Sequence, residues 1–89
     1  MVYHVNCHVP DNFDLDRRIQ GIGGFGWYLS VDEVIRYIAN GHTFYVNVDG
    51  RQVRVVVRQH PTSRRYYIAT EADNYPQNNL LSLPRCPGR

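Results

Sequence analysis

The chain has 89 residues, of which 43% are hydrophobic and 20% charged, and its net charge at pH 7 is +2. This length allows one core, so we expect a single domain over residues 1–89. No apolar run approaches the roughly 18 residues needed to cross a bilayer, and no signal-peptide pattern opens the chain. These observations favour a cytoplasmic protein without membrane contact. All ten basic residues are arginine, yet a net charge of +2 is small for a nucleic-acid binder, which usually carries a dense basic patch.

The first ten residues alternate between apolar and polar side chains. This pattern predicts one strand from Val2 to Val9, with His4 and His8 on the polar face. Two imidazoles four residues apart in a strand lie roughly 13 Å from each other, too far to share a metal, so we expect no metal site. A second short strand is predicted from Arg17 to Ile22, although its glycines weaken it.

A glycine-rich segment, from Ile19 to Tyr28, precedes the clearest helix signal and contains the only tryptophan. Glycine lets other groups approach the main chain closely, and a helix N-terminus presents free N–H groups. Two interpretations stay open: a ligand-binding corner or a tight turn over the core. The order G-I-G-G-F-G does not match the dinucleotide-binding fingerprint G-x-G-x-x-G, so a dinucleotide fold is excluded.

The helix is predicted from its caps and its apolar stripe. Ser30 as N-cap and Glu33 three residues later form a capping box, and Asn40-Gly41 supplies the stop. The acidic first turn would repel a bound phosphate, which weakens the idea of an anion site there. The apolar stripe comprises Val31, Val34, Ile35, Ile38 and Ala39.

A hairpin and a last strand follow the helix. Asp49-Gly50 is a strong two-residue turn signal between strands Thr43 to Val48 and Arg51 to Arg58. This turn sets a register in which Val46 faces Val53 and Tyr45 faces Arg54. A strand from Arg65 to Thr70 is predicted with Tyr66 and Ile68 inward. The outer face of the sheet would then carry Tyr45, Arg54, Arg58, Arg65, Tyr67 and Ala69.

The C-terminal part has turn residues from Asp73 to Asn79, and then Leu80, Leu81 and Leu83, which we expect to close one end of the core. The predicted fold is therefore α+β, a mainly antiparallel sheet of four or five strands with one helix packed on one face, in the order β-(β)-α-β-β-β. The sequence favours reduced thiols at Cys7 and Cys86 over a disulfide, and leaves their pairing open.

Several segments resemble a known family. They are Ile22-Gly23-Gly24 with Trp27, Asp32-Glu33-Val34-Ile35, Phe44-Tyr45-Val46, Tyr67-Ile68-Ala69-Thr70 and the closing Asn78-Asn79-Leu80-Leu81-Ser82-Leu83-Pro84 before Cys86. Together they resemble the small bacterial family catalogued as domain of unknown function 3892, from about Ile19 to Cys86. The resemblance implies a compact standalone module. Because that family has no established activity, it implies no catalytic residue.

Catalysis is not expected. His42 and His60 lie in predicted turns, and no serine has the sequence of a nucleophile elbow. No nucleophile, base and orienting group are therefore brought together, and we expect neither an enzyme nor a cofactor.

The favoured function is a non-catalytic binding module for an anionic, nucleotide-like ligand, comparable to phage-encoded sponges that sequester nucleotide signals. Arginine forks bind phosphates, and tyrosine rings stack on bases or ribose. We also expect a homodimer or a larger assembly. The candidate ligand-binding residues are Gly23, Gly24, Gly26, Trp27, Tyr45, Arg54, Arg58, Arg65 and Tyr67.

Two other interpretations stay open. A protein–protein interaction module or homo-oligomeric adaptor is the main alternative, because tyrosine and arginine are enriched in interfaces. The same residues are also common on a solvated sheet face. An RNA-stacking platform would use Tyr45 and Tyr67, but a single helix and the absence of lysine count against nucleic acid.

Overall fold

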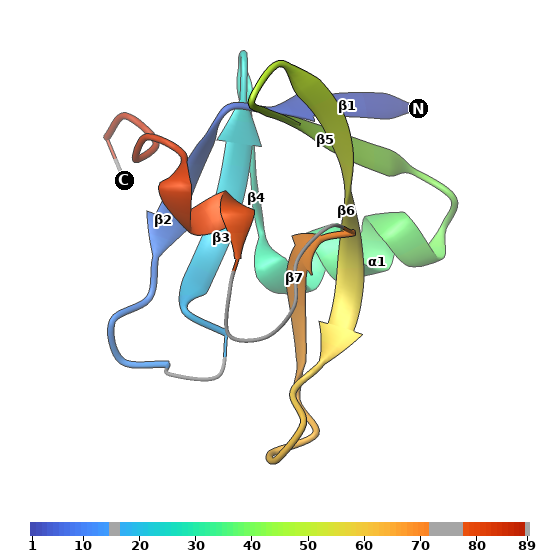
Figure 1. Cartoon of the computed structure of the whole chain (residues 1–89), viewed down its shortest axis with the longest axis vertical. Helices are drawn as coiled ribbons and strands as arrows, with labels where there is room; N and C mark the ends of the chain where they lie inside the picture. Colours follow the sequence, from blue (N-terminus) through green and yellow to red (C-terminus); the bar gives the residue numbers. More distant parts are fainter. Residues whose placement is uncertain (15–16, 72–77, 89) are drawn as a thin grey trace.

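The computed structural model describes residues 1–14, 17–71 and 78–88 (Figure 1). Within these residues the chain forms two sheets, one α-helix and one 3-10 turn. The elements in chain order are β1 (Val2–Val5), β2 (Cys7–Pro10), β3 (Ile19–Gly24), β4 (Trp27–Ser30), α1 (Val31–Ala39), β5 (Thr43–Val48), β6 (Arg51–Gln59), β7 (Tyr66–Thr70) and η1 (Asn79–Ser82). The turn predicted at residues 73–79 lies mostly outside the described residues.

The seven described strands form a four-stranded sheet in the order β1-β5-β6-β7 and a three-stranded sheet in the order β2-β3-β4. Among the described strand pairs, only β1–β5 is parallel. The α+β class with mainly antiparallel pairing is therefore confirmed. Helix α1 contacts strands of both sheets, so one amphipathic helix covers a core that two sheets share.

The strand number exceeds the predicted four or five because the N-terminal segment is divided into β1 and β2, and because β4 is an additional strand. The chain leaves β1 at Asn6, whose N–H donates to the carbonyl of Gly23 at 2.9 Å. It then continues as β2 in the other sheet. The alternating pattern from Val2 to Val9 is the same on both sides of this break, so periodicity could not reveal it.

The glycine-rich segment is a β-hairpin. Strands β3 and β4 pair from Gly21–Ser30 to Gly24–Trp27, and the turn places Gly26 at φ +80°, a region that glycine adopts without strain. Strand β4 was not predicted, because two glycines in the preceding strand lowered the strand signal of the whole segment.

The helix caps are confirmed. The Ser30 hydroxyl accepts from the Glu33 N–H at 3.2 Å, and the Glu33 carboxylate accepts from the Ser30 N–H at 2.9 Å. The backbone bond from Ser30 lowers the pKa of Glu33 below its usual value. Gly41 follows the C-cap at φ +92°. The apolar stripe is shorter than predicted, because Ala39 in the last turn is exposed.

The β5–β6 hairpin has the predicted register. Val46 pairs with Val53, and Tyr45 pairs with Arg54. Both turn residues have positive φ, 52° at Asp49 and 80° at Gly50, as a primed two-residue turn requires. The Asp49-Gly50 turn signal therefore predicted the register of this hairpin correctly.

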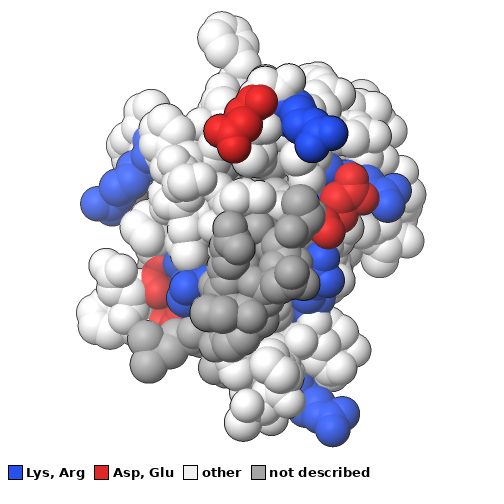
Figure 2. Space-filling model, viewed as in Figure 1, with Lys and Arg blue, Asp and Glu red and all other residues white. Residues whose placement is uncertain are grey.

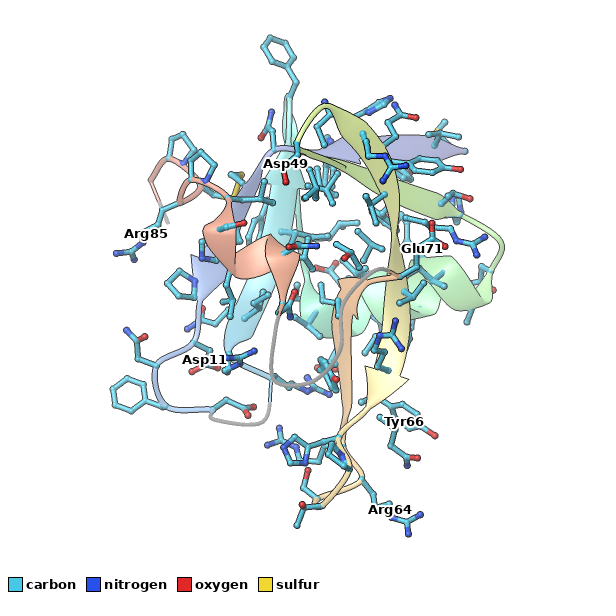
Figure 3. All side chains as sticks on the ribbon, viewed as in Figure 1. Asp11, Asp49, Arg64, Tyr66, Glu71 and Arg85 are labelled. Atoms are coloured by element: carbon cyan, nitrogen blue, oxygen red, sulfur yellow. A yellow bond between two sulfur atoms is a disulfide. The ribbon has the colours of Figure 1, made fainter. Side chains whose placement is uncertain are left out.

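The predicted orientation of β7 is confirmed for Ile68, which lies in the core, and is wrong for Tyr66, Tyr67 and Ala69. Tyr66 is 54% exposed, whereas Tyr67 and Ala69 are buried together with Ile68. Figure 3 shows Tyr66 pointing away from the sheet at the end of the strand. Because β7 is covered on both faces over residues 67–69, the rule of one buried and one solvated face does not apply to it.

The core contains Phe44, Val46, Val34, Ile22 and Leu80, all almost fully buried. Leu81 and Leu83 pack against it, so the closure of the core by the C-terminal leucines is confirmed. No helix within the described residues is long and apolar enough to cross a membrane.

The expectation of reduced thiols is wrong, because Cys7 and Cys86 form a disulfide with their Cα atoms 4.8 Å apart. Two backbone bonds align the C-terminal tail with β2: His8 N–H donates to the carbonyl of Pro84, and Cys86 N–H donates to that of His8, each at 2.9 Å. This alignment could not be predicted from cysteine spacing. A disulfide is uncommon in a reducing cytosol, so it does not support the expected cytoplasmic location.

Candidate functional site

Strands β5 and β6 start as a hairpin and then separate. Their described pairing ends at Tyr45–Arg54. Beyond that point β5 continues beside β1, while β6 turns away to pair with β7 through Gln59 (Figure 1). Between the separating strands lies a cavity of about 400 Å³, here called the β5–β6 groove. It is lined by Ile38, Gly41, His42, Thr43, Arg54, Val55, Val56 and Val57.

The groove combines apolar walls with a few polar groups. Ile38 reaches it from α1, and valines line it from β6. His42 also lines it, with its ring packed against Tyr3 and Tyr37 and a buried Nδ1 that has no hydrogen-bond partner among the described residues. Concave sites with apolar walls and few polar groups are typical of small-molecule binding.

Arg54 brings a positive charge to the groove. Its side chain is half exposed, and its guanidinium lies 3.5 Å from the Glu71 carboxylate, which is also half exposed. Such a surface pair contributes little energy, so an anionic ligand could replace Glu71 at low cost. Tyr45 pairs with Arg54 on the neighbouring strand. Arg54 and Tyr45 are therefore the two predicted site residues that the structure brings together beside the groove.

Two other predicted residues, Arg58 and Tyr67, pair with each other across β6 and β7. Arg58 donates from Nη2 to the carbonyls of Thr70 at 3.4 Å and Glu71 at 3.2 Å. Tyr67 is buried. Arg58 is thus bound to the end of β7, and the Tyr67 ring cannot form an open stacking surface.

Arg65 is held elsewhere by an ion pair. Its guanidinium donates two hydrogen bonds to the Asp14 carboxylate, at 2.8 and 3.2 Å. Asp14 also accepts from the N–H of Arg17 at 3.0 Å. This bidentate pair connects the loop before β7 to the segment after β2, and Arg65 does not line the groove.

Close packing requires glycine in the β3–β4 hairpin. A Cβ at position 23 would lie 2.9 Å from Cys7 Sγ and 3.1 Å from Cys86 Sγ, and a Cβ at Gly24 would collide with the His4 carbonyl and the Trp27 indole. The ring centroids of Trp27 and Tyr3 lie 5.4 Å apart. A separate cavity of about 280 Å³ touches Gly24, Gly26 and Trp27. Packing therefore explains Gly23 and Gly24, and a ligand role for this corner stays a prediction.

The start of α1 is surrounded by acidic groups. A cavity of about 290 Å³ there is lined by Asp11, Asp14 and Asp32 together with Arg17, and Arg17 is paired with Asp32 at 2.9 Å. Negative charge at this helix start disfavours a phosphate. Within the described residues, no three His, Cys, Asp or Glu side chains are placed to hold a metal ion.

Charges of both signs are mixed on the face shown in Figure 2, without a continuous basic surface. Figure 3 places Arg64 at the far tip of the β6–β7 loop, away from Glu71. The arginines are therefore dispersed, and the described structure has no broad basic patch on the face in view.

His42, Thr43 and Val57 were missed as site residues, because the groove depends on where two strands separate. One signal was present in the sequence. Val55-Val56-Val57 interrupts the alternation of β6, and an apolar run on both faces of a strand indicates a change in its surroundings.

Comparison with known proteins gives a family and no activity. A family model described as protein of unknown function (DUF3892) matches residues 12–84, and the chain therefore belongs to this family. No curated protein and no solved structure matches the chain. The matched range includes the whole β5–β6 groove, whereas Cys7 and Cys86 lie outside it.

Proposed function

We propose that this member of the DUF3892 family is a non-catalytic binding module, and that it holds an anionic, nucleotide-like small molecule in the β5–β6 groove. The observation that carries the proposal is the combination of Arg54 with an apolar cavity of about 400 Å³. Sequestration of such a ligand needs no catalytic group.

The groove has the properties that this ligand class requires. Its volume of about 400 Å³ is within the usual range for small-molecule sites, roughly 300–1,000 Å³. Ile38 and the valines of β6 offer apolar walls to a planar ring system, and the Thr43 hydroxyl can donate to or accept from a sugar hydroxyl. The Arg54 fork suits a phosphate, and the adjacent Tyr45 ring offers a surface for stacking.

Calorimetric titration with AMP tests this proposal. Arg54→Gln should weaken binding about tenfold or more, since a hydrogen bond to a charged group contributes roughly 1.5–3 kcal/mol. Arg51→Gln is the matched control: it removes the same charge from the same strand, but at an exposed position outside the groove. Equal loss in both variants would indicate unspecific charge attraction and contradict the proposal.

A homo-oligomeric interaction module is the second candidate, because the outer face presents the row His4–Tyr45–Arg54 across β1, β5 and β6. Phe25 at the β3–β4 tip adds an aromatic side chain that is 98% exposed. Light scattering should then give at least a dimer mass, and Tyr45→Glu should lower it. A monomer at high micromolar concentration would exclude this candidate.

A further inference from the structure

The main chain of β6 directs polar groups toward the β5–β6 groove, beyond the last described pair of the β5–β6 hairpin. The Glu71 N–H donates to the Arg54 carbonyl at 2.9 Å, and the register continues with Val56–Ala69 and Arg58–Tyr67. In an antiparallel ladder, residues that bond one neighbour alternate with residues that face the opposite side. The C=O of Val55 and the N–H of Val57 therefore lie on the side of β6 that faces the groove.

No described strand pairs with β6 along this edge beyond Arg54. The C=O of Val55 and the N–H of Val57 follow each other along the edge, an acceptor next to a donor. Val55 is almost fully buried, and buried main-chain groups that lack a partner are costly. A ligand that satisfies both groups at once would recover this cost.

This inference rests on the proposed function: we infer that this edge of β6 forms hydrogen bonds with a nucleobase, and that the ligand is a nucleoside monophosphate. An adenine ring carries an amino donor beside a ring-nitrogen acceptor in one plane, complementary to the Val55 carbonyl and the Val57 N–H. The base then lies against the valine side chains. Its phosphate extends to Arg54, at the end of the groove where the hairpin pairing stops.

An added peptide strand would use the same main-chain groups, but the shape of the groove favours a compact ligand. The groove is bounded by β5, by β6 and by Ile38 and Gly41 at the end of α1. A strand continuing along β6 at about 3.3 Å per residue would soon meet the end of α1. The Arg54 charge also suits the phosphate, which an ordinary peptide lacks.

Ligand analogues separate this inference from the proposed function. AMP, 1,N6-etheno-AMP and ribose 5-phosphate share a phosphate and a sugar, but only AMP has a free donor–acceptor edge. Both analogues should bind the full chain at least about tenfold more weakly than AMP, as two lost hydrogen bonds imply. If etheno-AMP binds as tightly as AMP, the base-edge inference is overturned while the anion site stands. If neither AMP nor ribose 5-phosphate binds at millimolar concentration, both proposals fail.

A pair of variants tests the main-chain donor directly. Val57→Pro removes the N–H that faces the groove but no bond to β7, whereas Val57→Ala keeps this N–H and shortens the side chain. AMP affinity should fall in the proline variant and persist in the alanine variant. If the proline variant does not fold, hydrogen exchange decides: AMP should slow exchange of the Val57 amide in the wild-type protein, and ribose 5-phosphate should not. Unchanged exchange with bound AMP would refute the inference.

Discussion

The Cys7–Cys86 disulfide should supply a large share of the stability of this domain. The two cysteines are 79 residues apart, so the bond closes nearly the whole chain into a loop. For a loop of this length the chain-entropy model gives about 4.5 kcal/mol of stabilisation. A domain of this size has a total free energy of unfolding of roughly 5–13 kcal/mol, so the bond is a substantial part of it.

Cys86→Ser, or reduction of the wild-type protein, should therefore lower the melting temperature by about 20 °C or more. Calorimetry with and without dithiothreitol measures this effect, and the Cys7→Ser/Cys86→Ser variant is the control that dithiothreitol should not affect. A stabilising disulfide is refuted if the reductant leaves the wild-type melting temperature unchanged, or if thiol titration of the unreduced, unfolded protein finds two free cysteines.

Three further perturbations follow from the packing, the helix cap and the groove. Val46→Asp should abolish the folded state, because it places a carboxylate without a partner in the core; circular dichroism should show native signal only for the exposed control Asn47→Asp. The pKa of Glu33 is lowered in the folded protein. Its ionised carboxylate therefore stabilises the fold at pH values above the ordinary carboxyl pKa, and this stabilisation is lost as the pH falls through the lowered pKa. The melting temperature should therefore fall more on acidification in the wild type than in Glu33→Gln, and identical profiles would contradict the capping role. Glu71→Gln should tighten AMP binding a few-fold in calorimetry by releasing Arg54, and weaker binding would show that Glu71 contacts the ligand.

Local signals in the sequence predicted the elements that depend on local chemistry. The capping box at Ser30 and Glu33 and the Asp49-Gly50 turn each fix a conformation within a few residues, and both were predicted correctly. Other features depend on which segment, distant in the sequence, packs beside a given strand. They are the division of the N-terminal strand at Asn6, the disulfide and the burial of both faces of β7. Such long-range pairing leaves no periodicity in the sequence.

The site was predicted only in part for the same reason. Arg54 and Tyr45 were placed together because the hairpin register follows from its turn. The other wall of the groove, at His42 and Thr43, becomes part of the site only because β5 leaves β6 to pair with β1. The glycines attracted attention as a ligand corner, yet close packing around the disulfide and Trp27 explains two of them.

Amide chemical-shift mapping with AMP tests the central claim most directly, because it locates the ligand without prior choice of residues. We expect the shifts to concentrate on residues 41–43 and 54–57, on both walls of the β5–β6 groove. Arg54→Gln should suppress them and Arg51→Gln should not. Shifts confined to Gly24–Trp27 in the β3–β4 hairpin, or the absence of any shift with saturating AMP, would contradict binding in the groove.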